Sequence, residues 1–180
     1  MADRDAASEH SSVLYTPEQR QRRDASVWTL VQGILAPLQF LVFVVSLVLV
    51  LRYLSTGAGE SVAIASVLLK TFLLYAIMIT GSLWEKDVFG EYLFVDMFFW
   101  EDVVSMLVML LHSWYVLAVV FSWYGPVGQS YIALAAYVAY VINAAQFLWK
   151  FRLARKGASP ASETGRQPAP AAEAAAGGVS

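Results

Sequence analysis

The sequence predicts an all-α integral membrane protein, a bundle of four transmembrane helices with both termini in the cytoplasm. The first observation is composition, because 58% of the 180 residues are apolar and only 14% are charged, against roughly 45–50% and about 25% in a soluble domain. The second is the distribution of charge, since only ten of the 26 charged residues lie between residues 27 and 149. The third is a set of four apolar runs, each close to the about 20 residues that a membrane span needs.

The same composition excludes several classes of protein. So few charges over the central stretch cannot cover the surface of a soluble globular domain. A net charge of −2 without a basic face excludes a nucleic-acid-binding protein. The chain has no cysteine, and therefore no disulfide, thiolate nucleophile or cysteine-ligated cluster. Its two histidines, His10 and His112, are too few for a zinc or di-iron site built on histidines.

Residues 1–26 form a polar N-terminal segment that precedes every apolar run, so they do not have the pattern of a cleavable signal peptide. Within this segment, Thr16-Pro17-Glu18-Gln19 has the pattern of a capping box with proline at the first helical position. We expect a short helix to begin here, to carry Arg20, Arg22 and Arg23, and to lie on the membrane surface before the first span.

The four spans are predicted at Val27–Tyr53, Ser61–Trp84, Val103–Trp123 and Gln129–Lys150. Buried helices of soluble proteins are rarely so long and so apolar, and helices satisfy every backbone polar group within lipid. We therefore expect one transmembrane domain over residues 27–156. Residues 157–180 are predicted to be a disordered tail, because 18 of these 24 residues are Ala, Pro, Gly or Ser.

Basic residues near the span ends predict the orientation, since they are enriched on the cytoplasmic side. Four crossings place only Arg52 on one side of the membrane. Eight basic residues fall on the other side: Arg20, Arg22, Arg23, Lys86, Lys150, Arg152, Arg155 and Lys156. Both termini and the one sizeable loop, Glu85–Asp102, are therefore expected in the cytoplasm, in a multi-pass protein of the inner membrane.

Lys70 and His112 lie deep inside the predicted spans, where ionisable side chains are costly and often functional. Lys70 lies near the centre of the second span, and its side chain either extends to the nearer interface, forms a buried ion pair or anchors a ligand carboxylate. His112 lies at the middle of the third span and either hydrogen-bonds a neighbouring helix, ligates the metal of a tetrapyrrole or relays protons. Eleven residues separate it from Glu101, so both face one way, about 16 Å apart along the axis.

Amides in the first and fourth spans are further candidates. Gln32 and Gln39 are seven residues apart and share one face, and Pro37 between them is expected to kink the helix, which would form a pocket wall. The fourth span carries a stripe of small and polar residues that favours close helix packing with hydrogen bonds across the contact. Its members are Ala135, Ala139, Asn143, Gln146 and Lys150.

The predicted loop Glu85–Asp102 is acidic where basic residues are the rule, with six carboxyl groups against Lys86. Aromatic residues alternate with the acids: Phe89, Tyr92, Phe94, Phe98, Phe99 and Trp100. One interpretation is an aromatic belt at the interface with solvated acids. The other is a site, because crowded carboxyl groups partly removed from water hold their protons to about pH 7, and flat aromatic walls can stack a planar ligand.

Several blocks of this sequence resemble the vinyl (bacterio)chlorophyllide hydratases of bacteriochlorophyll biosynthesis. The first blocks are Tyr15-Thr16-Pro17-Glu18-Gln19-Arg20 and Trp28-Thr29-Leu30-Val31-Gln32-Gly33-Ile34-Leu35-Ala36-Pro37. Later blocks are Trp84-Glu85-Lys86, Phe98-Phe99-Trp100-Glu101-Asp102 and Tyr140-Val141-Ile142-Asn143-Ala144-Ala145-Gln146-Phe147. The blocks occur in order from Tyr15 to Arg155, so the resemblance covers the chain except its tails.

The resemblance implies a hydro-lyase that adds water to the C3 vinyl group of chlorophyllide a or a related bacteriochlorophyllide, giving the 1-hydroxyethyl derivative. It implies no cofactor, because magnesium is present only as part of the chlorin. Such a reaction needs an acid to protonate the vinyl group, a positioned water and a base. We expect Glu101 or Asp102 to donate the proton, with Glu85 or Asp87 as the partner that handles water.

Substrate binding is predicted for residues of the spans and the loop: His112, Trp100, Gln32, Gln39, Asn143 and Lys70. The magnesium has an axial position, for which His112 competes with water, Gln32 and Asn143, since oxygen is the more usual ligand of this cation. Four helices leave little room for a chlorin, so the site is expected either to open toward lipid or to be shared between subunits. Partners would be a second copy of the chain or other enzymes of the pathway.

Two other classes of function compete with a hydratase. A pigment carrier or assembly factor would use the same residues to bind chlorins and leave the vinyl group intact. A small transporter would show inverted repeats and helices broken at the midplane. The two halves of the chain show no such repeat, and only Pro37 interrupts a span.

Overall fold

The structure, a computed structural model, describes residues 15–157, and its regular elements there are all helices. A short helix, α2 (Pro17–Ala25), precedes four long ones: α3 (Val27–Thr56), α4 (Glu60–Phe89), α5 (Phe99–Val120) and α6 (Gly125–Gly157). The prediction of an all-α protein is thus confirmed. The predicted disordered tail lies, apart from its first residue, outside the described residues.

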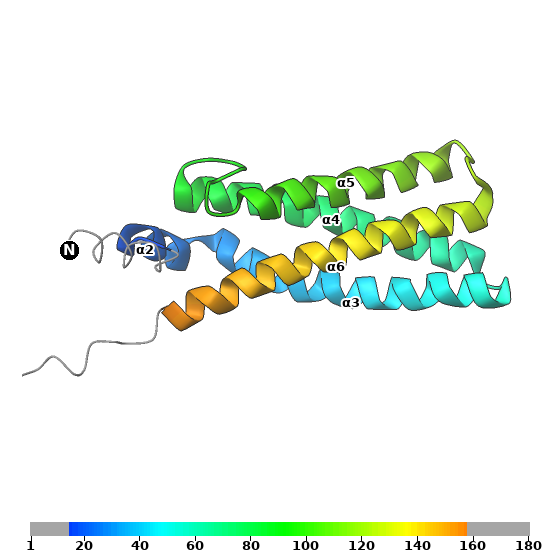
Figure 1. Ribbon diagram of the computed structural model, residues 1–180, viewed down its shortest axis with the longest axis horizontal. Helices are drawn as coiled ribbons and strands as arrows, with labels where there is room; N and C mark the ends of the chain where they lie inside the picture. Colours follow the sequence, from blue (N-terminus) through cyan, green and yellow to red (C-terminus); the bar gives the residue numbers. More distant parts are fainter. Residues whose placement is uncertain (1–14, 158–180) are drawn as a thin grey trace, which may run out of the picture.

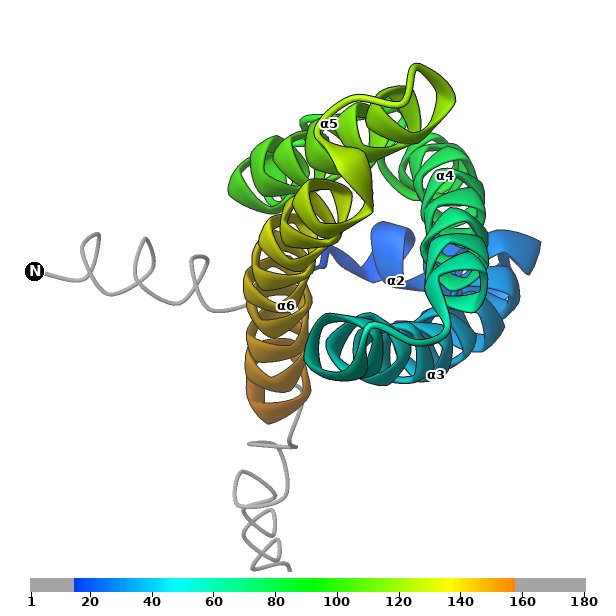
Figure 2. The same ribbon diagram turned by 90° about the vertical axis from the view of Figure 1, so that its right-hand side faces the viewer.

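The long helices run up and down and follow one another round the bundle in chain order (Figures 1 and 2). Packing is most extensive within two hairpins, α3 with α4 and α5 with α6, while the contacts that join the hairpins are fewer. Helix α2, the connection between α4 and α5, and the end of α6 all lie at the same end of the bundle (Figure 1). This end therefore collects most of the charged residues, and it is called the polar end below.

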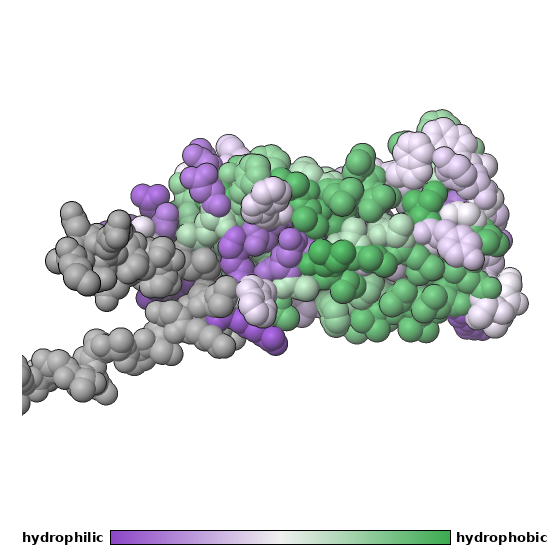
Figure 3. Space-filling view, viewed as in Figure 1, coloured by the Kyte–Doolittle hydropathy of each residue, from purple (hydrophilic) through white to green (hydrophobic). Residues whose placement is uncertain are grey.

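All four long helices are long and apolar enough to cross a membrane. The surface carries a broad hydrophobic band, with polar side chains gathered toward the polar end and over the C-terminal half of α6 (Figure 3). Much of this outer surface is leucine, valine, isoleucine and phenylalanine, which stay exposed because no other protein element covers them. The features are those of a multi-pass membrane protein, in which lipid takes the place of water around the apolar faces.

The capping box that the sequence predicts is present at the start of α2. The backbone N–H of Gln19 donates to Thr16 Oγ1 at 3.2 Å, and Gln19 Oε1 accepts from the Thr16 N–H at 2.9 Å. Contacts with α3 and α4 then hold the helix in place: the Arg23 guanidinium lies over the Tyr15 ring, and this ring stacks on Phe89 of α4 at 5.9 Å. Helix α2 is thereby fixed against the polar end of α4.

The prediction of one loop over Glu85–Asp102 is wrong. Helix α4 continues to Phe89, and α5 begins at Phe99, so only residues 90–98 connect them. Gly90 ends α4 with a φ of +92°, a left-handed conformation that glycine adopts without strain. The prediction was wrong because it ended each helix where the acidic residues begin. Hydropathy indicates where lipid contact stops, whereas a helix continues as long as its backbone hydrogen bonds and its packing support it.

The interior of the bundle is built from tyrosines and small side chains as well as aliphatic ones. Tyr137 is buried at the centre, where its hydroxyl is hydrogen-bonded to Ser46 at 2.6 Å, and Ser46 in turn to Ser66 at 2.7 Å. The predicted packing stripe on α6 is only partly correct. Ala135 is exposed, while Ala139 is buried together with Ala133 and Ala136, because the packed face turns gradually around this long helix.

Candidate active site

Three carboxyl groups lie together at the polar end of the bundle. Glu85 comes from the last turns of α4, and Glu101 and Asp102 from the first turn of α5. The reversal over residues 90–98 brings these two helix ends side by side, and acidic groups suit the first turn of a helix. The residues are only 5%, 8% and 3% exposed, respectively, so these are buried carboxyl groups and not a solvated acidic surface.

Glu101 is held by α6. Its Oε2 forms an ion pair with Lys150 Nζ at 2.7 Å, and Lys150 also donates to the Met97 carbonyl. The backbone carbonyl of Glu101 accepts from Asn143 Nδ2 at 2.9 Å and from Ser105 Oγ at 2.8 Å. Because both ends of this residue are fixed by hydrogen bonds, its carboxylate has a defined place and a defined counter-ion.

Glu85 and Asp102 form a second pair next to Glu101. Their carboxyl groups lie near enough for their charges to interact, and Glu101 adds its charge nearby. Asp102 Oδ2 also accepts from the Phe94 N–H at 2.7 Å, which ties the connection to α5. Glu85 Oε2 is buried and has no hydrogen-bond partner among the described residues. Two carboxyl groups in such contact share a proton more readily than both ionise.

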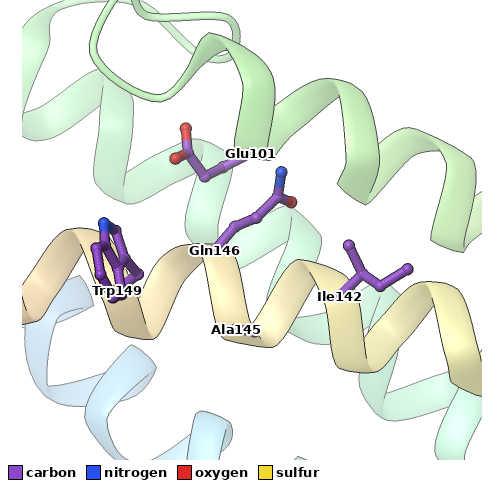
Figure 4. A pocket seen from close by; sticks show the side chains of 5 residues that line it. All are labelled: Glu101, Ile142, Ala145, Gln146 and Trp149. Carbon is purple, nitrogen blue, oxygen red and sulfur yellow. The ribbon is translucent and has the colours of Figure 1, made fainter.

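A groove of about 440 Å³ lies beside Glu101, between α5 and α6. It is lined by Glu101, Ile142, Ala145, Gln146 and Trp149, whose side chains line the wall in Figure 4. The volume falls within the range of about 300–1,000 Å³ that is usual for small-molecule sites. Trp149 is 68% exposed and Ile142 is also exposed, so the groove opens on the outer face of the bundle. A flat apolar molecule could reach Glu101 from the side.

The structure leaves other predicted residues away from this groove. Asp87 is exposed on α4 and has no hydrogen bond or ion pair among the described residues, in contrast to Glu85. Trp100 is exposed and packs edge-on against Phe99. Gln32 donates its amide N–H groups to Thr80 Oγ1 at 2.7 Å and to the Ile77 carbonyl at 3.3 Å, so it joins α3 to α4.

The aromatic residues of this region divide into two sets. Phe98 is fully buried among the rings of Trp84, Phe89, Phe147 and Phe151. The second set is exposed: Tyr92, Phe94, Phe99 and Trp100. One set thus packs the polar end of the bundle and the other faces outward, while the interfacial belt and the wall that stacks a planar ligand both stay predictions.

Lys70, His112 and Gln39 lie deeper in the bundle and are buried. Lys70 does not extend to an interface, as one alternative predicted, but places Nζ 3.7 Å from the centre of the Tyr140 ring. The hydrogen bond predicted between His112 and a neighbouring helix is absent from the described residues, since its Nδ1 lies 2.8 Å from the Val108 carbonyl of its own helix. Lys70 Nζ, His112 Nε2 and Gln39 Nε2 have no hydrogen-bond partner there.

Sequence reasoning missed two residues of the site, Lys150 and Gln146. Both were seen only as members of a packing stripe on the fourth span. The signal was the spacing of Asn143, Gln146 and Lys150, at i, i+3 and i+7, which places an amide, a second amide and an ammonium on one helical face. The spacing does not show that this face of the helix packs against Glu101.

These features define a class of protein: a helical membrane protein with four spans, in which a groove on the outer face is lined by one of three buried carboxyl groups, Glu101. The family model for 2-vinyl bacteriochlorophyllide hydratase matches residues 15–153, and the chain belongs to this family. Proteins of that name from Cereibacter sphaeroides and Rhodobacter capsulatus are 65% and 62% identical to it over 143 and 142 residues. Each match covers 79% of this chain, and 88% and 82% of the relatives. No solved structure matches the chain.

Proposed function

We propose that this protein is a hydro-lyase that adds water to the C3 vinyl group of a bacteriochlorophyllide or of chlorophyllide a, giving a 1-hydroxyethyl group. Family membership supports the reaction. The observation that carries the proposal is the meeting of Glu101, paired with Lys150, and the Glu85–Asp102 pair beside an open groove. An alkene hydratase needs a proton donor, a base and water at one place, and the carboxyl groups at this end of the bundle would serve as the donor and the base.

The pigment would enter the groove from the bilayer. A chlorin is flat and mostly apolar, and the groove offers the exposed ring of Trp149 and the side chain of Ile142 on its open side. The vinyl end would lie toward Glu101, near the polar end, where water arrives. The bundle would then need no internal cavity of the size of a chlorin.

The proton would pass from the Glu85–Asp102 pair to Glu101 and from there to the terminal carbon of the vinyl group. Protonation breaks the carbon–carbon π bond and leaves a cation on the carbon next to the macrocycle, which delocalises the charge. A water molecule then forms the new carbon–oxygen bond, and the Glu101 carboxylate takes up the proton that this water loses. Glu101 then passes this proton back to the Glu85–Asp102 pair, so that the sum is the addition of one water and every carboxyl group regains its first state.

Lys150 would hold the Glu101 carboxylate at the groove and stabilise the charge that remains when its proton has left. The ion pair at 2.7 Å is largely shielded from solvent, where such interactions are stronger than at a surface. Asn143 and Ser105 would hold the backbone of the same residue. A fixed acid adjacent to the reacting carbon avoids part of the entropic cost of bringing the groups together.

The polar end would face the cytoplasm, in the inner membrane of the cell. The support is that Arg20, Lys86, Lys150 and Arg152 lie on the elements that meet there, whereas Arg52 lies near the other end of α3. Water and protons would reach the carboxyl groups from that side. Whether the protein works with a second copy or with other enzymes of the pathway stays a prediction from the sequence.

Binding of the pigment by Lys70, His112 and Gln39, and ligation of its magnesium by His112, also stay predictions. In the described structure these residues do not line the groove. Contact with the pigment would require the α3–α4 hairpin to separate from the α5–α6 hairpin. The packing between the hairpins is weaker than the packing within them, so the bundle would open between the hairpins first. Asn143 is near the groove but uses its amide to hold Glu101 and Ser105.

The test is to give vinyl chlorophyllide to membranes that contain the full-length protein. A hydratase yields a pigment heavier by one water, and its absorption band moves to shorter wavelength because a conjugated double bond is lost. A carrier binds the pigment and returns it unchanged, and this result would overturn the proposal. Membranes without the protein are the control for spontaneous hydration.

A further inference from the structure

Gln146 is a polar residue in the groove wall to which the reaction outlined above gives no task. It lies on α6 between Asn143 and Lys150, both of which bind Glu101. Its own amide makes no hydrogen bond within residues 15–157, and its Oε1 is buried there without a partner. Gln146 and Glu101 line the same groove, one from each helix (Figure 4).

A buried amide oxygen without a donor is unfavourable, and the cost disappears when a donor enters the site. The amide of Gln146 has no hydrogen bond to break, so it can turn about its last bond and present its oxygen to the groove. The pigment face of a chlorin offers no donor there. The added water offers two O–H groups before the reaction, and the hydroxyl that it becomes offers one afterwards.

Resting on the proposed function, we infer that Gln146 is the positioning residue for the added oxygen: its amide oxygen accepts one O–H of the attacking water, while Glu101 accepts the other. A water that donates to both groups turns a lone pair away from them, toward the carbon that becomes the carbinol. Glu101 and Gln146 line the same groove from two adjacent helices, so a water that donates to both is fixed in place and approaches one face of the cation. The same hydrogen bond to Gln146 then holds the hydroxyl of the product.

This arrangement makes Gln146 the determinant of stereochemistry. The carbinol carbon of a 1-hydroxyethyl group has two mirror-related configurations, and a planar cation can give either. With the water held on one side, one epimer prevails. Without Gln146 the water is still near Glu101 but is no longer fixed in direction, so both faces become accessible to it.

The experiment is Gln146→Leu in the full-length protein in membranes, with the ratio of the two product epimers measured by chromatography. We expect the minor epimer to rise at least about threefold and kcat to fall about three- to tenfold, the effect of one hydrogen bond between uncharged groups. KM for the vinyl pigment stays unchanged. Binding of the hydroxyethyl product, measured by titration in the absence of turnover, weakens by a similar three- to tenfold factor, because only the product carries the hydroxyl.

Gln146→Met, which keeps the length of the side chain, provides a second variant should the leucine variant fold poorly. The matched control is Gln129→Leu, which removes another buried amide from the same helix, near its N-terminal end and outside the groove; its epimer ratio should equal that of the wild type. An unchanged ratio and unchanged product binding in both Gln146 variants overturn the inference. Product binding is measured without turnover, so this outcome is distinct from a protein that hydrates nothing.

Discussion

Two groups of buried polar side chains lie in this bundle, and their surroundings differ. At the polar end, Glu101 has Lys150 as counter-ion, and Glu85 and Asp102 have each other. At the centre, Lys70 and His112 have no hydrogen-bond or ion-pair partner on the nitrogens that face the interior, within the described part of the chain. In the first group Glu101 lines a groove, whereas the second group is closed in by Tyr137, Tyr140 and their neighbours.

The difference shows that burial of a polar residue is weak evidence for a function by itself. Both groups carry the unfavourable free energy of removing polar atoms from water. Only the carboxyl groups combine this with a route for substrate, a counter-ion and a second acid. The following variants test whether activity belongs to the polar end and whether the centre is structural.

The largest effect is expected from Glu101→Gln. The amide keeps the size of the side chain but can neither donate the proton to the vinyl group nor accept one from water. We expect the rate of hydration to fall at least about 10²-fold, the low end for acid–base catalysis. Mass detection of the hydroxyethyl pigment measures the rate, and a rate near that of the wild type would remove Glu101 from the reaction.

A smaller loss is expected from Glu85→Gln, with Asp87→Asn as its matched control. Glu85 is buried against Asp102, while Asp87, two residues further on, is exposed. We expect Glu85→Gln to slow hydration about tenfold or more, because proton supply to Glu101 is reduced. Asp87→Asn should leave the rate unchanged. Equal rates for the two variants would contradict a role for the buried pair.

Replacing Lys150 separates stability from chemistry. Lys150→Met leaves the Glu101 carboxylate without its counter-ion at a place largely shielded from solvent. We expect the free energy of unfolding in detergent to fall by about 1.5–3 kcal/mol, the range for hydrogen bonds to charged groups, and the rate of hydration to fall severalfold. Adding Glu101→Gln should restore the stability and leave the rate low, since the uncompensated charge is then gone.

The smallest effect is expected at the centre, from Lys70→Met. The change removes the free-energy cost of burying an amine, about 2.5–3.5 kcal/mol in a membrane. It also removes the favourable interaction of this amine with the Tyr140 ring, about 2 kcal/mol when desolvated. Because the two effects nearly cancel, thermal unfolding should shift little, toward higher stability. Hydration should stay within about twofold of the wild type. A loss as large as that of Glu101→Gln would place the pigment at the centre, where the sequence also allows it.

The sequence by itself determined the fold class, the spans and the short capped helix before them. These features depend on local properties: the length and apolarity of a run decide whether it crosses lipid, and the Thr16–Gln19 pattern fixes where α2 begins. It also proposed four acids for the site, Glu85, Asp87, Glu101 and Asp102, without separating the exposed Asp87 from the three buried ones.

Tertiary structure decided which of these acids are buried and what each one meets. Composition does not distinguish Glu85 from Asp87, since both are acids at the end of the same span. In the structure Glu85 faces α5 and Asp87 faces outward, because the two residues lie about 200° apart around α4. Lys150 is 49 residues from Glu101 and meets it only because α6 packs on α5. Such pairings join helices through their faces, and the rotation of each helix about its axis is set by packing with all its neighbours together.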